Sequence, residues 1–357
     1  MHIGLIGLPQ AGKKTLLRLL TGVDARALAP TNGGGIPGVC PVRDPRMDRL
    51  ASMYRPKKVT PATVQCLLMP DMTKDSAKNQ ELLKALQLVD VLGLLVRAFT
   101  DETIFHLEGS VDPLRDIETV HAELILNDLL FIEKRLERLE KEQGKRAGVD
   151  RTKERALCAK LQAHLEGGVP LRTLALDPDE RKLLSGVLLL TRKPLLIILN
   201  VDEGALQDPH LLAEVQRRYE RHGLHLVQVS AKIEEELAEL EDPAERAAFL
   251  RDLGIEESAV DRLTRMCFEA LGLIAYFTVG ADEVRAWTVR RGASAAEAGG
   301  AIHSDIERGF IRAELIKYDD LIALGTEQAV ASAGKLQLKG KEYIVEDGDI
   351  LNFRFNV

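Results

Sequence analysis

The chain has 357 residues, with 48 Lys and Arg against 55 Asp and Glu, a formal net charge of -7 and four scattered cysteines. This length predicts two or three domains with ample core. The acidic balance excludes a general nucleic-acid-binding surface, so we expect no DNA partner and only a local RNA contact. Cysteines without metal-ligand spacing indicate reduced thiols in a cytoplasmic protein. We expect no signal peptide and no membrane span, because the N-terminus starts in a strand and apolar runs are short.

The strongest pattern lies at the N-terminus. An apolar run, His2 to Ile6, is followed by a glycine loop, Gly7 to Gly12, and then by apolar helical periodicity. Loop glycines let backbone N–H groups turn inward around phosphate oxygens in front of a helix N-terminus. The order strand, loop, helix therefore favours a phosphate-binding P-loop over a ligand-free turn. The expected phosphate-binding residues are Gln10, Ala11, Gly12, Lys13, Lys14 and Thr15.

One position of this loop departs from the pattern G-x-x-x-x-G-K-[ST]. The residue after Lys13 is Lys14, and the hydroxyl comes one residue late, at Thr15. In P-loop proteins the Ser or Thr at that position holds Mg²⁺. Nucleotide binding and Mg²⁺-dependent hydrolysis are therefore separate predictions, and we expect no metal ligand among these residues.

The following segments predict a doubly wound α/β domain. Apolar strands are expected at 64–69, 89–96, 194–199 and 224–229, with a helix at 179–190. Polar residues just past the C-terminal ends of parallel strands lie where such folds bind ligands. Here Asn200 can hold the loop and Glu203 can contact a base edge, while Ser230, Ala231 and Lys232 can cover the base. Simple strand-end turns are the alternative for both segments.

Two further regions differ in character. Residues 112–170 predict an antiparallel helical hairpin whose basic residues, including Lys145, Arg146 and Arg151, gather towards its tip. Ion pairs on a solvated face and an RNA-contacting arm both remain open for these charges. From Ile274 the chain is rich in strands around one helix, which suggests a β-grasp module with a late hairpin turning at Gly340.

Taken together, these segments resemble the YchF family, the Obg-like ATPases within the Obg branch of translation-associated P-loop GTPases. The most specific matches are GVCPVRDPRMDRLA, FHLEGSVDPLRDIETV, NVDE, SAKIEEELAEL and the segment from YFTVGADEVRAWTV to DGDILNFRFNV. The resemblance implies a P-loop NTPase doubly wound sheet with an inserted coiled-coil arm and a C-terminal β-grasp (TGS) domain. The implied domains are 1–111 with 171–272 (nucleotide binding), 112–170 (arm) and 273–357 (TGS).

The resemblance also implies a function. The family prefers ATP to GTP, a preference tied to the motif N-x-x-E, which Asn200 and Glu203 match; Val201 and Ser230 to Lys232 would line the base. His106 matches a family histidine linked to hydrolysis. The implied partner is the ribosome or ribosomal RNA, contacted through the arm and the TGS domain by a cytoplasmic protein that we expect to be a monomer.

Departures from the family pattern weaken the prediction of an enzyme. The family's motif D-I-A-G-L aligns with Leu68 to Met72, so Leu68 stands where the family has the Asp near the metal. The glycine-rich switch that follows in the family is shortened here to TKDSAKNQ. The first switch, within 29–38, is remodelled, with the family Thr falling near Thr31 or Asn32. We therefore expect a nucleotide-binding protein with weak or lost Mg²⁺-dependent hydrolysis. A slow active ATPase or GTPase and a nucleotide-free scaffold remain the alternatives.

Overall fold

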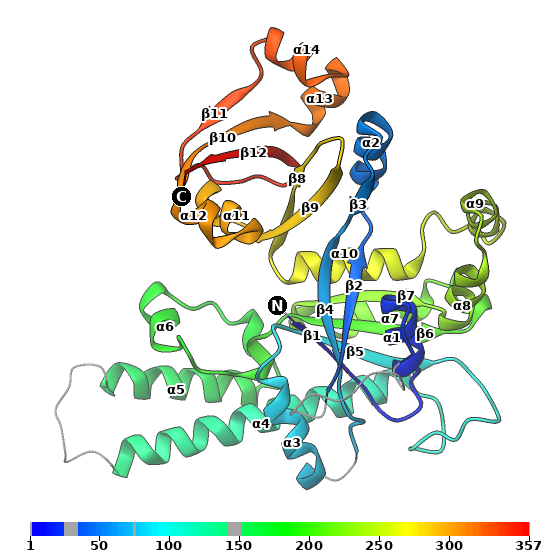
Figure 1. Ribbon diagram of the computed structural model, residues 1–357. Coiled ribbons are helices and arrows are strands. Elements are labelled where there is room, and N and C mark those ends of the chain that lie inside the picture. The colour runs from blue at the N-terminus through cyan, green and yellow to red at the C-terminus, as the bar shows by residue number, and fades with distance from the viewer. Residues whose placement is uncertain (1, 25–34, 74–75, 142–150, 357) are drawn as a thin grey trace. The chain divides into compact units, whose positions relative to one another are not determined.

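The computed structural model describes residues 2–24, 35–73, 76–141 and 151–356 (Figure 1). The chain divides into two compact units, Met1–Gly38 with Gln65–Leu263 and Val39–Val64 with Thr264–Val357. Most of the expected first switch, including Thr31 and Asn32, lies outside the described residues. The grouping of residues 39–64 with the C-terminal part was not predicted.

The first unit is built on a six-stranded sheet, which agrees with the predicted doubly wound fold. Its strand order is β2-β4-β1-β5-β6-β7. β1 lies in the middle and pairs in parallel with both β4 and β5, and β6 pairs in parallel with β5 and β7. All seven residues of β6 are buried, as expected for a central parallel strand. The strands are β1 (His2–Ile6), β2 (Ile36–Val42), β4 (Ala62–Leu68), β5 (Val91–Ala98), β6 (Leu195–Val201) and β7 (Leu224–Val229).

Helices of the first unit follow the strands along the chain. They are α1 (Lys13–Thr21), α3 (Ser76–Leu86), α6 (Pro178–Leu183), α7 (His210–Arg218), α8 (Ala231–Glu239), α9 (Pro243–Asp252) and, crossing into the second unit, α10 (Ala259–Ala270), with short 3-10 turns at Leu171–Thr173, Leu190–Arg192, Glu203–Ala205 and Glu220–His222. The predicted helix 179–190 is wrong in length. It ends early because Gly186 adopts a left-handed φ of 84°.

Two long helices form the predicted arm, α4 (Pro113–Lys141) and α5 (Arg151–Glu166). They pack through a hydrophobic core that includes Ile132, Leu139, Leu157 and Leu161 and continues into the segment 171–189. Ion pairs also join the two helices, Arg135 with Glu154 and Arg155 with Glu140. Lys145 and Arg146, which the sequence placed near the tip, lie outside the described residues.

The second unit is a mixed sheet with the order β11-β10-β12-β8-β9-β3 around a core that includes α11 (Ala295–Ile302). Its strands are β3 (Lys58–Thr60), β8 (Leu273–Thr278), β9 (Glu283–Arg290), β10 (Phe310–Lys317), β11 (Gln337–Lys339) and β12 (Asp349–Phe355), and its other helices are α2 (Pro45–Tyr54), α12 (Ser304–Arg308), α13 (Tyr318–Leu324) and α14 (Glu327–Ser332). The predicted hairpin at Gly340 is wrong, because β11 and β12 each pair with β10. Beyond Gly340 the chain forms a bridge to Ser294 at Ile344 and buries Val345.

An edge strand of this second sheet comes from the first part of the chain. β3 pairs in parallel with β9, with Lys58 opposite Glu283. α2 precedes β3 and starts at Pro45, with the carboxylate of Asp44 accepting a hydrogen bond from Arg46 N. The Arg46 guanidinium also forms an ion pair with Asp347, which ties α2 to the C-terminal segment.

Two further observations concern cysteines and membranes. Cys40, Cys66, Cys158 and Cys267 are all buried and unbridged. Among the described helices, none combines the length and the apolar character that a bilayer span would need.

Candidate functional site

The glycine loop between β1 and α1 adopts a conformation that depends on its glycines. Gly7 has a φ of 151°, and a Cβ there would lie 2.3 Å from the carbonyl oxygen of Leu95 on β5. Gly12 stands just before α1 with a φ of 94°. Only glycine adopts such angles without strain, so the loop can lie tightly against the neighbouring strand. Gln10 shares the left-handed region, with a φ of 62°.

Asn200 fixes this loop to the end of β6. Its side chain is buried, donates from Nδ2 to the Ala11 carbonyl at 3.1 Å and accepts from the Ala231 backbone N–H at Oδ1, also at 3.1 Å. Both ends of one amide are thus used to hold two predicted site segments together. Asn200 therefore holds the glycine loop against the start of α8, while its part in a nucleotide site stays a prediction.

An open cavity of about 330 Å³ lies in front of the loop. Its walls are residues 10–15, Ile36 and the segment that follows β4, from Leu68 to Asp71. A volume of this order falls at the lower end of small-molecule binding sites. The loop conformation and the N-terminus of α1 make this cavity suited to an anionic group.

Lys13 is the buried cation of this cavity. Its Nζ donates to the carbonyls of Gly7 and Leu8, each at 2.7 Å, and forms a 2.7 Å ion pair with Asp71. Burial lowers the pKa of Lys13, whereas its hydrogen bond and attraction to Asp71 act in the opposite direction. Lys14, by contrast, is exposed to solvent at the start of α1.

The two positions expected to serve a Mg²⁺ ion carry side chains that cannot bind it. Hard cations take oxygen ligands, but Lys14 follows the loop lysine and the buried, apolar Leu68 ends β4. Within the described ranges, no three His, Cys, Asp or Glu side chains come together as a metal site.

The other predicted residues divide between buried and exposed positions. Val201 is buried at the end of β6, and Ser230 and Ala231 are buried at the start of α8. Glu203 and Lys232 are exposed. Through Asn200, the structure thus brings together the glycine loop and the segment 230–232, while the roles of Glu203 and Lys232 towards a base stay predictions.

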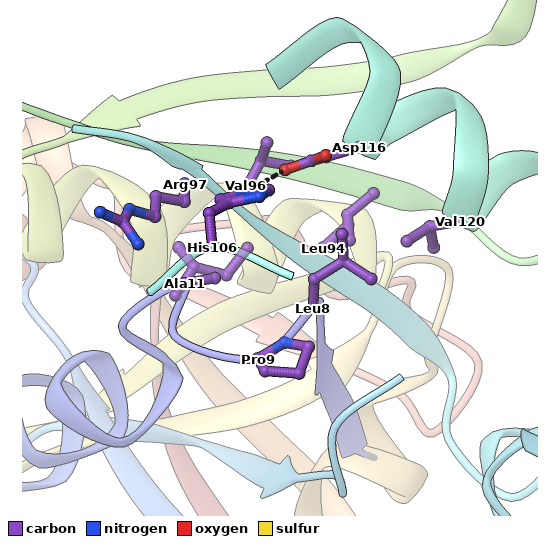
Figure 2. A pocket seen from close by; sticks show the side chains of 10 residues that line it. Leu8, Pro9, Ala11, Leu94, Val96, Arg97, His106, Asp116 and Val120 are labelled. Atoms are coloured by element: carbon purple, nitrogen blue, oxygen red, sulfur yellow. Dashed lines mark hydrogen bonds and ion pairs between the residues drawn. The ribbon is translucent and has the colours of Figure 1, made fainter. Parts of the chain in front are cut away.

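His106 lies against the opposite side of the glycine loop. Together with Leu8 and Ala11 it lines a void of about 10 Å³, roughly the space of one water molecule (Figure 2). Its Nδ1 accepts from the Glu108 backbone N–H at 3.1 Å, so Nε2 donates to Asp116 at 3.0 Å. Both ring nitrogens are therefore engaged in this conformation. A catalytic role for His106 stays a prediction.

Comparison with known proteins shows which family shares this sequence and fold. The chain is 41% identical to the ribosome-binding ATPase YchF of Haemophilus ducreyi and 40% identical to that of Bacillus subtilis, over 99% of both chains in each case. The chain belongs to the YchF family. The YchF GTPase structure from Schizosaccharomyces pombe superposes with a TM-score of 0.85 at 31% identity, covering 99% of this chain and 97% of that one. Residues 273–356 match the family model YchF-GTPase_C, described as a protein of unknown function (DUF933).

Two residues near the site of this YchF-family chain were missed by sequence reasoning. The Arg97 guanidinium, buried at the end of β5, donates to the carbonyls of Phe99, Asp101 and Ile104 and so shapes the loop that leads to His106. Asp116 orients the histidine ring and also accepts from Arg115. For Arg97, the sequence does contain a signal, because it is a charged residue at the end of an otherwise apolar strand.

Proposed function

We propose that this YchF-family chain is a nucleotide-binding, ribosome-associated P-loop protein that prefers ATP to GTP and has weak or lost Mg²⁺-dependent hydrolysis. One observation carries the proposal: the glycine loop and its Asn200 clamp are complete around the cavity, whereas Lys14 and Leu68 stand at the two positions expected to serve the metal. The names of the relatives, ribosome-binding ATPases, support the nucleotide and the ribosome as partners.

Phosphate recognition would come from the loop itself. Backbone N–H groups at the start of α1 and the Lys13 ammonium supply positive potential, and exposed Lys14 adds a second positive charge. A fixed lysine can offset phosphate charge without a metal. We therefore expect nucleotide binding that does not depend on Mg²⁺.

Hydrolysis is expected to be slow for a physical reason. Phosphoryl transfer depends mainly on positioning and on neutralising the charge of the transferred group. Without a Mg²⁺ ion bridging the phosphates, that stabilisation is reduced, and a rate loss of about two or more orders of magnitude follows from losing such electrostatic groups.

The preference for adenine would rest on the segment after β6. Guanine recognition in N-K-x-D proteins uses a carboxylate at the last position of the motif, and here that position carries the longer Glu203. Its exposed side chain would contact the base, while the Asn200 side chain stays hydrogen-bonded to the loop.

Ribosome association would involve the arm and the second unit. α4 carries Arg138 and Lys141 in its last turn, both exposed to solvent, and such cations bind phosphate backbones.

The deciding experiment is calorimetric titration of the full chain with ATP and with GTP, each with and without Mg²⁺. The proposal expects ATP to bind more tightly than GTP, with an affinity that Mg²⁺ barely changes. Absence of binding for both nucleotides would instead support a nucleotide-free scaffold. Tight binding only with Mg²⁺, together with steady phosphate release, would support an active ATPase.

A further inference from the structure

The third hydrogen-bonding position of the loop lysine is taken by a carboxylate of the same chain. An ammonium has three donors, and on Lys13 two of them face loop carbonyls while the remaining partner is Asp71 Oδ1 at 2.7 Å. The Lys13 side chain is 5% exposed and the Asp71 side chain 55% exposed. The carboxylate therefore lies at the wall of the cavity, on the side open to solvent.

Backbone hydrogen bonds hold Asp71 in this place. On one side of it, Met69 N donates to the Leu5 carbonyl at 3.0 Å, and on the other side, Met72 N donates to the Gly7 carbonyl at 3.2 Å. The Gly7 carbonyl also accepts from Lys13 Nζ. Pro70 restricts the backbone between these contacts. The carboxylate is thus attached at a fixed point beside the loop rather than reaching it from a distant segment.

The lysine of a P-loop reaches the β- and γ-phosphates of a bound nucleotide. A diphosphate brings no γ-phosphate and can be held by the loop N–H groups, so it leaves Asp71 paired with Lys13. A triphosphate brings an additional anion to the side of Lys13 that Asp71 already occupies, and like charges placed together there are costly. The two ligands therefore differ in whether the Lys13–Asp71 pair must break.

We propose that Asp71 takes the place of the γ-phosphate on Lys13 and makes the cavity selective for nucleoside diphosphates over triphosphates. This inference rests on the proposed nucleotide-binding function and specifies the ligand of the same site. It is independent of the base preference, because base recognition is expected from the segments after β6 and β7, whereas Asp71 follows β4.

The burial of Lys13 explains why the carboxylate stays. A buried ammonium without an anionic partner is unfavourable, and Asp71 is the anion that accompanies it. Because Asp71 is largely exposed, its side chain can turn into water when a triphosphate enters. Selectivity should therefore appear as a ratio of affinities, not as complete exclusion of ATP.

The test compares dissociation constants for ADP and ATP, measured by calorimetry on the full chain without Mg²⁺. Asp71→Gly removes the carboxylate, and Asp71→Asn removes its charge with almost no change in shape. The matched control is Asp252→Asn, which makes the same charge change at an exposed position at the end of α9. Circular dichroism and thermal melts check that each variant is folded. If Asp71→Gly fails to fold, the isosteric Asp71→Asn variant still provides the test.

We expect the unaltered chain to bind ADP about tenfold more tightly than ATP, and both Asp71 variants to gain about tenfold in ATP affinity with ADP affinity nearly unchanged. Asp252→Asn should leave the ratio as it was. Nucleotide binding with an ADP to ATP ratio that no Asp71 variant alters would overturn this inference and leave the proposed function standing. No binding of either nucleotide to any folded variant would overturn the proposed function, and this inference with it.

Discussion

A methyl group added to Gly12 would lie 2.6 Å from Asn200 Nδ2, so the glycine loop and the end of β6 fit together only while residue 12 lacks a side chain. The Asn200 side chain also donates a hydrogen bond to the Ala11 carbonyl, and these two residues are 189 positions apart in the sequence. This hydrogen bond makes the shape of the glycine loop dependent on the position of β6.

Gly12→Ala should destabilise the fold and weaken nucleotide binding. The change adds strain at a φ of 94° and pushes against Asn200, which holds Ala11 and Ala231. We expect a loss of about 1–3 kcal/mol in the free energy of unfolding. Urea denaturation and ADP titration measure the two effects.

Gly22→Ala is the matched control for this prediction. Gly22 also has a positive φ, of 70°, but a Cβ there would meet nothing within 4 Å. The loss of unfolding free energy in Gly22→Ala therefore reports backbone strain alone. Any additional loss of unfolding free energy in Gly12→Ala measures the contact with Asn200. Equal losses in the two variants, with unchanged ADP affinity, would contradict the role given to this contact.

Restoring the two metal-side groups should restore Mg²⁺ dependence. Lys14→Ser with Leu68→Asp places a hydroxyl and a carboxylate where P-loop enzymes hold the ion. Made in the Asp71→Gly background, the double change should make ATP binding Mg²⁺-dependent and raise phosphate release. Lys14→Ser alone, with one of the two groups, serves as the control. If ATP binding and phosphate release by the triple variant do not depend on Mg²⁺, then the altered switch segments, and not these residues, limit hydrolysis.

Charge reversal on the arm should weaken ribosome binding. Arg138→Glu with Lys141→Glu removes two exposed cations from the last turn of α4. If they contact ribosomal RNA, affinity falls and the slope of log affinity against log salt decreases by about two. Co-sedimentation with ribosomes over a range of salt concentrations measures both.

The control for the arm uses another helix with the same kind of end. Arg181→Glu with Lys182→Glu changes two exposed cations in the last turn of α6. This pair should leave the binding and its salt slope unchanged. Equal behaviour of the two double variants would remove α4 as a specific contact.

His121 should make the fold sensitive to acid. Burial, with His222 and Arg172 nearby, lowers the pKa of His121 to about 4. The unfolded chain takes up this proton near pH 6.5, so the contribution of neutral His121 to stability is complete above that pH and is lost as the pH falls towards 4. The maximum effect is about 3 kcal/mol.

His121→Phe tests this directly. His121 Nε2 has no hydrogen-bond partner within the described structure, so phenylalanine keeps a ring beside Tyr219 and removes the titrating group. The difference in unfolding free energy between pH 7 and pH 4.5 should shrink, while exposed His225→Gln should leave it unchanged. An identical pH profile for all three proteins would show that other groups govern acid unfolding.

Local patterns explain why much of this protein could be predicted. Apolar runs predict β1, β5 and β6, and the glycines at 7 and 12 predict the loop. Each of these patterns lies within a few consecutive residues, so the sequence alone reveals it. The Lys13–Asp71 pair could not be predicted. The sequence shows an acid after Pro70 but not where its side chain turns, which the backbone contacts of Met69 and Met72 decide.

Nonlocal pairing accounts for the main errors in the second unit. A strand as short as β11 carries no information about its partner, so the sequence suggested a hairpin at Gly340 where β11 in fact pairs with β10. The same holds for β3, whose three residues gain a partner only through β9.

The position of β3 has a consequence for synthesis of the chain. Thr60 donates to the carboxylate of Glu283, 223 residues further on. At ribosomal elongation rates the earlier segment waits on the order of tens of seconds for its partner. Throughout that interval α2 and β3 have left the exit tunnel without the sheet they complete, so a nascent chain halted before β9 would carry them unprotected, as a target for chaperones or proteases.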